Sequence, residues 1–410
     1  MSQPPIPEPE EVPRPPRPAH RPPHRWPPPP PPAQPPRAAA PARTTVPSST
    51  VPSSTVPPRP SGPAARRSRA TDRVGAGPRP VTWTGGSIRL RDQRLLPGQT
   101  ADVEIHRVDD LVTAVERLAV QGTAALGAVG AYGVALAITQ AGREGWDGST
   151  FTAAVGRLRA AGPAMTALAQ GVDTAYARID EGLDAVVAVG LAIATADERA
   201  SRAIGRHGAD WVLARLGDRP LRVLTHSDTG APATAVWGTA LGVIRELHAR
   251  GRVELVYVDE ARPLLVGSRL TAWELAQAGI DYRVQVDGAA AGVIIGGLVH
   301  VAIVGADRIA ANGDVRSSLG TLGVALACAH AGVPFVVAAS ASDVDEQPTG
   351  SAAAPVEQAP DEEVLTIAGQ RVAPTGARAH NPAFDVTPAG LVDALITEQG
   401  ARLPASPFTR

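Results

Sequence analysis

The chain has 410 residues, enough for two or three domains, and its 44% hydrophobic and 19% charged residues are typical of globular proteins. It contains a single cysteine, Cys328, and no lysine. These counts exclude an intramolecular disulfide framework, a multi-cysteine metal site and lysine Schiff-base chemistry. Arginine must therefore serve every permanent cationic role.

Residues 1–80 differ sharply in composition from the rest of the chain. They hold 27 of the 41 prolines and twelve arginines against four acidic residues, a net charge of +8, whereas residues 81–410 hold 27 arginines against 36 acids, a net charge of −9. Such a segment buries too little apolar surface to offset its chain entropy, so we expect a disordered, locally polyproline II tail. It is either a docking tail for a proline-binding or acidic protein partner, a plain solvated extension, or the product of an over-called start codon.

No apolar stretch near the N-terminus has the length of a secretory signal, which favours a cytoplasmic protein. Residues 118–141 carry no charge over a length that could cross a bilayer. Alanine, glycine and interspersed polar residues dominate this stretch, so we expect a buried helix and no membrane span. Gly127, Gly130 and Gly133 would let a neighbouring backbone or a ligand approach that helix closely.

Residues 81–217 are expected to form a mainly helical domain. Apolar residues recur at helical spacing over several stretches. These are 108–119, the Gly/Ala-rich segment, 150–160, 165–190 and 194–216.

Residues 218–410 are expected to form an α/β domain. Short β-branched runs predict strands at 221–225, 253–258, 282–286, 300–304 and 335–339. Helical stretches lie between them, at about 234–250, 269–278 and 317–331. Alternating strands and helices predict a mostly parallel, Rossmann-like sheet covered on both faces.

Ligands of parallel sheets bind beyond the carboxyl ends of the strands, where this chain places polar loops. The loops are 225–230, Asp259-Glu260, Asp287-Gly288 and 305–307. Each aspartate that follows a strand either acts on a ligand or ties down a loop. Adjacent residues at a strand end point to opposite sides, so His226 and Ser227 are not expected to form a Ser–His dyad.

Several other functions are disfavoured. The chain lacks the GxxxxGK[ST] phosphate-binding loop and the HExxH zinc motif, and its nine histidines show no metal-ligand spacing. We therefore expect neither a metal nor another cofactor. A net charge of −9 on residues 81–410 also argues against nucleic-acid binding.

Longer motifs carry a family resemblance. They include LRDQRLLPG (90–98), GAVGAYGVALA (127–137), THSDTGAPATAVWGTALGVIRELH (225–248), VDEARPLLVGSRLTAWEL (258–275), VGADRIAANGDV (304–315) and NPAFDVTP (381–388). Over residues 83–400 the chain resembles methylthioribose-1-phosphate isomerase, the methionine-salvage enzyme, and more distantly the regulatory subunits of eukaryotic initiation factor 2B. The resemblance implies a helical N-terminal domain, a Rossmann-like C-terminal domain and a homodimer.

The resemblance also assigns two catalytic positions. Family enzymes convert an aldose 1-phosphate into a ketose 1-phosphate and are thought to use a cysteine and an aspartate to move protons. The aspartate corresponds to Asp287, but the cysteine position holds Ser227, and Asp228 stands where the family has asparagine. A serine hydroxyl is a far weaker acid than a thiol, whose pKa is about 8.5.

The family's substrate-binding positions are altered as well. Residues that the resemblance places there are Gln121, Gly122, Thr123, Gly162, Val266, Ser317 and Ser318. Arginine is replaced at Gln121 and Gly162, and lysine at Ser318, so three phosphate-facing cations are missing. Arg157, Arg159 and Arg316 lie close enough in sequence to be considered as substitutes.

Two functions follow from these replacements. The first is an isomerase-family protein whose activity is lost or redirected to a less anionic pentose derivative. The alternative is a non-catalytic paralogue that binds a sugar or nucleotide, in the manner of the initiation-factor subunits. In both, the ligand is a small sugar phosphate or a related molecule.

Overall fold

The computed structural model describes residues 79–161, 166–228, 230, 237–345 and 358–403. The predicted tail, residues 1–80, lies outside this part of the chain except for Arg79 and Pro80. The described residues all belong to one compact unit.

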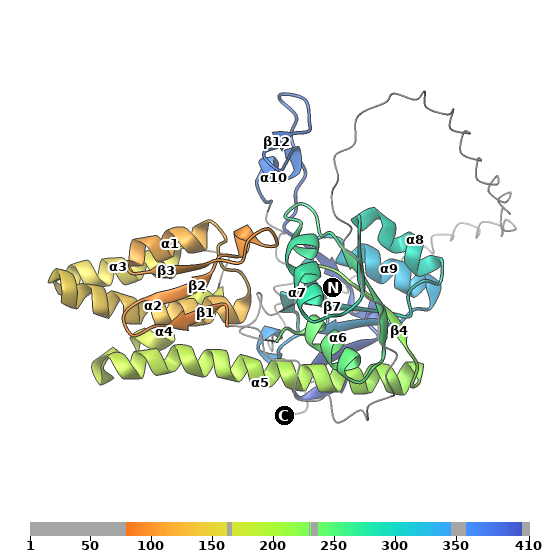
Figure 1. Ribbon diagram of the computed structural model, residues 1–410, viewed down its shortest axis with the longest axis horizontal. Coiled ribbons are helices and arrows are strands. Elements are labelled where there is room, and N and C mark those ends of the chain that lie inside the picture. The colour runs from red at the N-terminus through yellow and green to blue at the C-terminus, as the bar shows by residue number, and fades with distance from the viewer. Residues whose placement is uncertain (1–78, 162–165, 229, 231–236, 346–357, 404–410) are drawn as a thin grey trace, which may run out of the picture. The chain divides into compact units, whose positions relative to one another are not determined.

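The first part of this unit combines a small sheet with five helices (Figure 1). The antiparallel strands, in the order β1-β2-β3, are β1 (Val81–Trp83), β2 (Ile88–Arg91) and β3 (Asp102–Ile105). The helices are α1 (Val108–Glu116), α2 (Thr123–Glu144), α3 (Gly148–Ala160), α4 (Thr166–Tyr176) and α5 (Leu183–Leu216). The helical character was predicted, but the three short strands were not.

The Gly/Ala-rich segment forms α2, the central helix of this part. It is long and apolar enough to cross a membrane by length and composition, yet 78% of its most apolar window is buried inside the protein. The prediction of a buried helix is therefore confirmed. As expected, its glycines let neighbouring helices approach closely. A Cβ on Gly130 would lie 2.3 Å from the carbonyl oxygen of Leu168 in α4. A Cβ on Gly133 would lie 2.2 Å from Leu158 of α3.

Gly130→Ala is expected to destabilise the protein, because the added methyl group collides with the α4 backbone, which cannot yield as a side chain would. Overpacking of this kind typically costs about 1–3 kcal/mol. Gly142→Ala on the same helix is the matched control, since nothing lies within 4 Å of that position and alanine favours a helix by up to about 1 kcal/mol. In urea denaturation the two variants should change the free energy of unfolding in opposite directions. Equal stabilities would contradict the close packing of α2 on α4.

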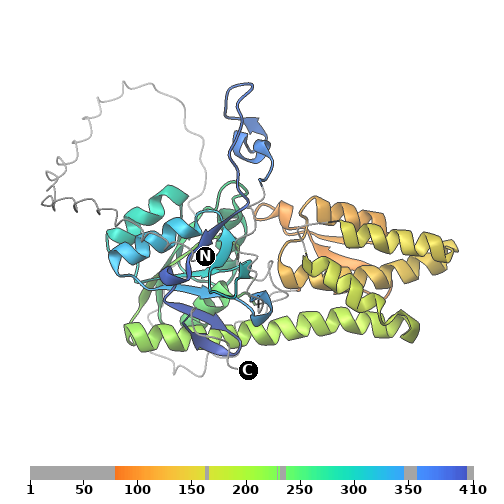
Figure 2. The ribbon, with the colours of Figure 1, turned by 180° about the vertical axis from the view of Figure 1, so that it is seen from behind.

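Helix α5 connects the two parts of the unit. It packs against α2 and α4 along one stretch and against α6, β14 and β15 along another, as Figures 1 and 2 show. The prediction of one helical run over 165–190 was wrong. Helix α4 ends at Tyr176, and Gly182, with a φ of 94°, precedes the first residue of α5.

The second part is built on a seven-stranded sheet in the order β15-β14-β10-β7-β4-β5-β6, parallel except for β15. Its strands are β4 (Leu221–Thr225), β5 (Val253–Asp259), β6 (Tyr282–Gln285), β7 (Val301–Gly305), β10 (Phe335–Ala338), β14 (Ala394–Thr397) and β15 (Gly400–Arg402). Its helices are α6 (Ala240–Ala249), α7 (Ala272–Gln277), α8 (Ala290–Ile295), α9 (Thr321–Ala331) and α10 (Asp361–Leu365). Two minor sheets consist of β8 (Arg308–Ile309), β9 (Val315–Ser318) and β13 (Phe384–Thr387), and of β11 (Thr366–Ile367) and β12 (Gln370–Arg371).

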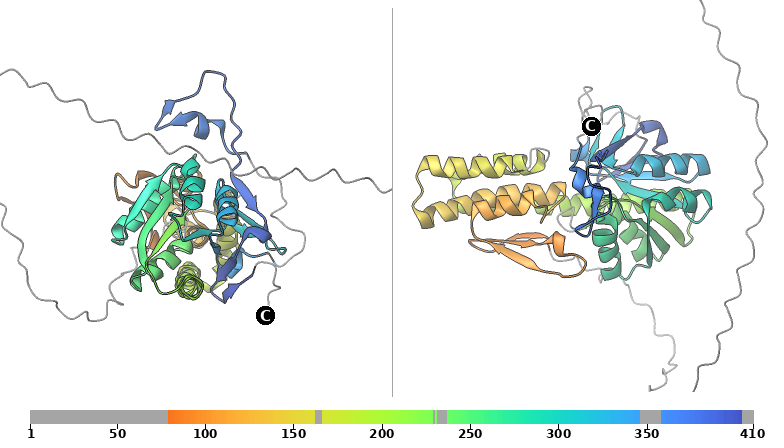
Figure 3. Two further views of the ribbon diagram at one scale, coloured as in Figure 1. Left: turned by 90° about the vertical axis from the view of Figure 1, so that its right-hand side faces the viewer. Right: turned by 90° about the horizontal axis from the view of Figure 1, so that it is seen from above.

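Alternating strand residues build two cores, one on each face of the sheet. Val301 and Ile303 of β7 pack with α6, α7 and the C-terminal turns of α5. Ala302 and Val304 pack with α8 and α9 on the other face (Figure 3). The predicted parallel sheet with helices on both faces is confirmed, and all five predicted strands are present.

Two predicted helices begin later than expected. Helix α6 begins at Ala240 instead of 234, and residues 237–239 are not helical. Ser317 and Ser318 belong to strand β9 instead of the helix predicted over 317–331. Gly320, with a φ of 108°, lies between that strand and the first residue of α9. The domain boundary near residue 217 stays a prediction.

Candidate functional site

A cavity of about 810 Å³ lies beyond the carboxyl ends of the parallel strands. Loops after β4, β5, β7, β10 and β14 contribute to its wall, as the sheet topology predicts. Residues from the N-terminal end of α2, from α4 and α5, from β9 and α10, and from the segment 381–384 also line it. The volume suits a small-molecule ligand.

Most of the predicted site residues meet in this cavity. Those that line it are Gln121, Gly122, Thr123, Ser227, Val266, Ser317 and Ser318. Gly162 lies outside the described residues. Asp287 is not part of the wall, although it follows β6 at the same edge of the sheet.

Ser227, at the cysteine position, is buried and has a φ of 74°. Its Oγ lies 2.5 Å from the Ser318 Oγ, and its carbonyl oxygen accepts a hydrogen bond from the Thr271 hydroxyl at 2.7 Å. Within the described part of the chain its hydroxyl therefore pairs with another neutral hydroxyl and with no base that would activate it.

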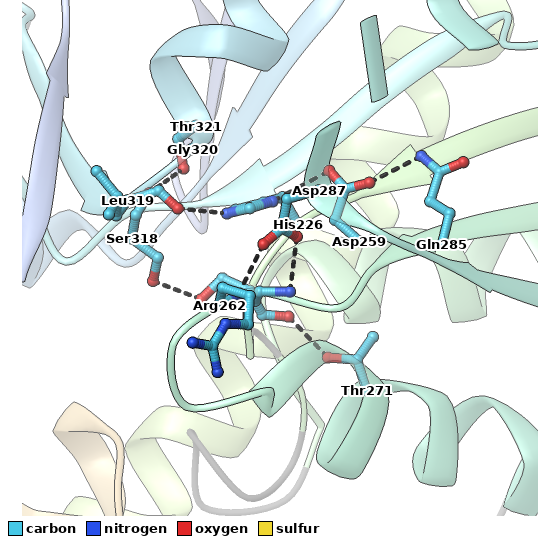
Figure 4. Close-up of polar contacts among 12 residues, drawn as sticks. His226, Asp259, Arg262, Thr271, Gln285, Asp287, Ser318, Leu319, Gly320 and Thr321 are labelled. Atoms are coloured by element: carbon cyan, nitrogen blue, oxygen red, sulfur yellow. Dashed lines mark hydrogen bonds and ion pairs between the residues drawn. The ribbon is translucent and has the colours of Figure 1, made fainter. Parts of the chain in front are cut away.

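The His226 ring is buried and contacts Asp259 and Leu319, whereas the Ser227 hydroxyl contacts Ser318, so the two do not form a dyad, as expected. Its Nδ1 lies 3.0 Å from Asp259 Oδ2, and its Nε2 lies 2.9 Å from the carbonyl oxygen of Leu319 (Figure 4). Gln285 donates to the other oxygen of Asp259 at 2.8 Å. Burial opposes the charged imidazole, but the hydrogen bond and charge of Asp259 outweigh it, and the pKa of His226 is raised. With two acceptors facing its nitrogens, the ring is best satisfied as an imidazolium that donates twice.

The raised pKa of His226 predicts how stability depends on pH. A histidine with a folded-state pKa above its ordinary 6.5 stabilises the fold fully below that value and loses its contribution as the pH rises through the folded-state pKa. We therefore expect the difference in unfolding free energy between wild type and His226→Gln to be largest near pH 6 and to shrink toward pH 9. A difference that grows with pH in urea titrations would show that the ring is neutral.

Asp287 is held by the loop after β5. Its Oδ1 accepts the backbone N–H of Ala261 at 2.8 Å and its Oδ2 that of Arg262 at 2.7 Å. One ligand atom each from His226, Asp259 and Asp287 lies within 4.8 Å of the others, a spacing that could hold a metal ion. These side chains are already engaged in hydrogen bonds, and a protonated imidazole cannot bind a metal. The cluster is therefore better explained as a hydrogen-bond network that holds the neighbouring loops in place than as a metal site.

Asp228 is the neighbour of Ser227 on the cavity wall. Burial, followed by the nearby charge of Glu274, raises the pKa of its carboxyl to about 7. Its Oδ1 is buried and has no hydrogen-bond partner among the described residues. This carboxyl therefore keeps its proton far more readily than an exposed aspartate does.

The charged side chains on the described wall are all acidic. They are Asp197, Asp228, Asp307, Asp343, Glu363 and Glu398. Within that wall no arginine or histidine is present, and the internal segments 162–165, 229, 231–236 and 346–357 contain none in their sequence. The three arginines considered as substitutes form ion pairs and do not line the cavity: Arg157 with Asp109, Arg159 with Asp173 and Arg316 with Asp307.

Sequence reasoning missed part of this wall. Asp197 lies in the middle of α5, and Asp343 and Glu398 follow β10 and β14. Strand β14 was not predicted, so Glu398 was not recognised as a residue that follows a strand. Asp343 follows a predicted strand, and that position was the one signal that could have drawn attention to it.

Comparisons with known proteins agree with this architecture. The sequence pattern of the Initiation factor 2 subunit family matches residues 119–404. A probable bifunctional methylthioribose-1-phosphate isomerase/methylthioribulose-1-phosphate dehydratase of Nocardia farcinica is 46% identical over 321 residues, 78% of this chain, and the match spans 58% of that longer relative.

Two solved structures are similar over 80% of the chain. One is the 5-methylthioribose 1-phosphate isomerase of Pyrococcus horikoshii OT3, with a TM-score of 0.73, 33% identity and 93% of its chain covered. The other is the translation initiation factor eIF-2B subunit delta of A. fulgidus, with a TM-score of 0.70, 35% identity and 96% covered. As its motifs indicate, the chain belongs to the Initiation factor 2 subunit family and is homologous to the methylthioribose-1-phosphate isomerases within it.

Proposed function

We propose that this protein keeps the sugar-sized cavity of the isomerase family but has lost the conversion of methylthioribose 1-phosphate, or has redirected it to a substrate without a phosphate ester. The observation that carries the proposal is the make-up of the cavity wall, which has a serine at the thiol position and six acidic side chains, with no arginine or histidine among its described residues.

The first deficit concerns proton transfer. A thiol exchanges protons near neutral pH, whereas the Ser227 hydroxyl is bonded, among the described residues, to another hydroxyl, that of Ser318. Loss of a general acid or base typically lowers a rate by about 10²–10⁴-fold. Ser227 can still donate a hydrogen bond, and Asp287 stays the proposed acid or base of any residual reaction.

The second deficit concerns the phosphate. Carboxylates repel a phosphate dianion, and in the described wall the N-terminal end of α2, at Gly122 and Thr123, is the feature that attracts an anion. A helix terminus contributes about 0.3–1 kcal/mol, up to about 2 kcal/mol when partly buried. That contribution does not replace three charge-assisted contacts.

Steady-state turnover of methylthioribose 1-phosphate tests the proposal. We expect a kcat/KM at least about 100-fold below that of a family member with cysteine, assayed in parallel. Turnover within tenfold of that enzyme would refute the proposed loss.

The likeness to an initiation-factor subunit, at 35% identity, supports a second candidate, a non-catalytic sugar- or nucleotide-binding regulator. This candidate predicts a thermal shift with pentose phosphates, nucleosides or nucleotides but no turnover. For either function we propose a cytoplasmic homodimer that binds a small molecule, and we leave a protein partner of the proline-rich tail as a proposal.

A further inference from the structure

Asp228 lies in the loop after β4, directly after Ser227, and both residues line the cavity. Asp228 is half-buried, and its Oδ1 is shielded from solvent and has no hydrogen-bond partner among the described residues. An ionised carboxylate with an oxygen shielded in this way lacks the solvation that stabilises its charge. The position therefore favours a carboxyl that holds a proton at the cavity wall.

Glu274 of α7 lies against the same loop. A Cβ on Gly230 would collide with the Glu274 carboxyl, so this carboxyl packs against the backbone two residues beyond Asp228. Glu274 is 2% exposed and is paired with Arg245 at 2.6 Å. After burial, its charge is the second cause that raises the pKa of Asp228, and the charge of Arg269 and the Gly230 backbone N–H oppose this shift without cancelling it. The surroundings of Asp228 thus differ from those of an exposed aspartate, whose carboxyl is ionised at neutral pH.

We propose that the Asp228 carboxyl is a catalytic acid of this cavity and has taken over the proton-donor role of the missing thiol. Asp228 is the sequence neighbour of the thiol position and lies on the same wall. A carboxyl that holds a proton near neutral pH can transfer it, whereas the Ser227 hydroxyl is far too weak an acid. This inference rests on the proposed function, because it names the residue that carries whatever isomerisation remains or has been redirected.

The proposed step is the opening of a furanose ring. The carboxyl transfers its proton to the ring oxygen while the bond between that oxygen and C1 breaks, and both electrons of the bond stay on the oxygen, which becomes a hydroxyl. The hydrogen that moves from C2 to C1 is carried separately as a proton, a role for which Asp287 stays the proposed group. The Asp228 carboxylate then accepts the proton that the C2 hydroxyl releases as the carbonyl forms. The residue ends the cycle protonated, and no redox partner is required.

Asp228→Asn tests the assignment, because asparagine has the shape of aspartate without its acidic proton. We expect this variant to lower kcat for methylthioribose 1-phosphate at least about tenfold, a modest value for a lost general acid, without raising KM. Ser227→Ala should lower kcat less, since it removes a hydroxyl that contributes at most a hydrogen bond. Asp110→Asn removes an exposed carboxylate of α1 outside the cavity and is the matched control, which should change neither constant. A larger loss in Ser227→Ala than in Asp228→Asn would overturn the assignment.

The same substitution in the Ser227→Cys background separates a catalytic role from a structural one. The thiol restores a group that exchanges protons near neutral pH, so Asp228→Asn should leave kcat unchanged in that background. If Asp228 only stabilised the loop, its substitution would lower kcat equally in both backgrounds. Equal losses would therefore refute the catalytic role.

These outcomes are separate from the test of the proposed loss of activity. Fast turnover by the wild type, together with the expected drop in Asp228→Asn, would refute the proposed loss alone. Slow turnover that Asp228→Asn leaves unchanged, or no measurable turnover by the wild type, would refute only the catalytic role of Asp228.

Discussion

Ser227→Cys is expected to raise kcat for methylthioribose 1-phosphate but to leave KM high, so that kcat/KM stays at least about tenfold below that of a cysteine-bearing family member. The thiol restores a group that exchanges protons near neutral pH, which accounts for a factor of about 10²–10⁴. The thiol does not improve binding of the phosphate group, which still meets carboxylates in the cavity. Steady-state kinetics with separate kcat and KM values distinguish the two deficits.

Ser342→Cys is the matched control, because Ser342 lines the same cavity outside the proposed catalytic positions. We expect this control to change neither constant. Addition of Gln121→Arg to Ser227→Cys should lower KM, since Gln121 lines the cavity at the N-terminal end of α2. Full rescue by cysteine alone would show that the phosphate pocket was never lost.

Arg245→Leu is expected to destabilise the protein by about 3–5 kcal/mol, the usual cost of leaving one member of a buried ion pair behind. Arg245 Nη2 lies 2.6 Å from Glu274 Oε2, and the two side chains are 11% and 2% exposed. Arg245 also donates to the carbonyl oxygen of Trp237 at 2.7 Å and lies over that indole ring. Its loss leaves the Glu274 carboxylate buried without this partner.

Arg252→Leu provides the comparison for this change. Arg252 pairs with Asp218 on the surface, where the two side chains are 32% and 71% exposed. Exposed pairs contribute about 0–1 kcal/mol, so this variant should unfold at nearly the wild-type urea concentration. Equal effects of the two variants would mean that the pair of Arg245 and Glu274 is open to water.

The architecture could be predicted from the sequence because the local residue pattern of most elements agrees with their place in the fold. The five predicted strands are short β-branched runs that end in polar loops. Four of them lie in the interior of the seven-stranded sheet, and β6 forms one of its edges. The helix over 118–141 was predicted as buried from its alanine and glycine content, and Gly130 and Gly133 do face neighbouring helices. Motif positions placed Gln121, Ser227 and Ser318 in one cavity.

Other features depend on long-range packing that no local pattern shows. The chain from Gln285 through Asp259 to His226 and the Leu319 carbonyl joins residues up to 93 positions apart. The cavity wall likewise combines Asp197, in a helix with no motif, with Glu398, 201 positions later. The charge of the cavity could therefore be inferred only in part. The sequence showed that arginines and a lysine are missing from the binding positions, but it did not show which acidic residues line the cavity.

The most direct test of this altered pocket compares two ligands that differ only by the phosphate. Calorimetric titration of the wild-type protein with 5-methylthioribose and with methylthioribose 1-phosphate gives the contribution of that group to binding. We expect the neutral sugar to bind at least as tightly as its phosphate ester. Binding of the ester more than about 100-fold more tightly, equivalent to about 2.7 kcal/mol, would contradict the loss of the phosphate site.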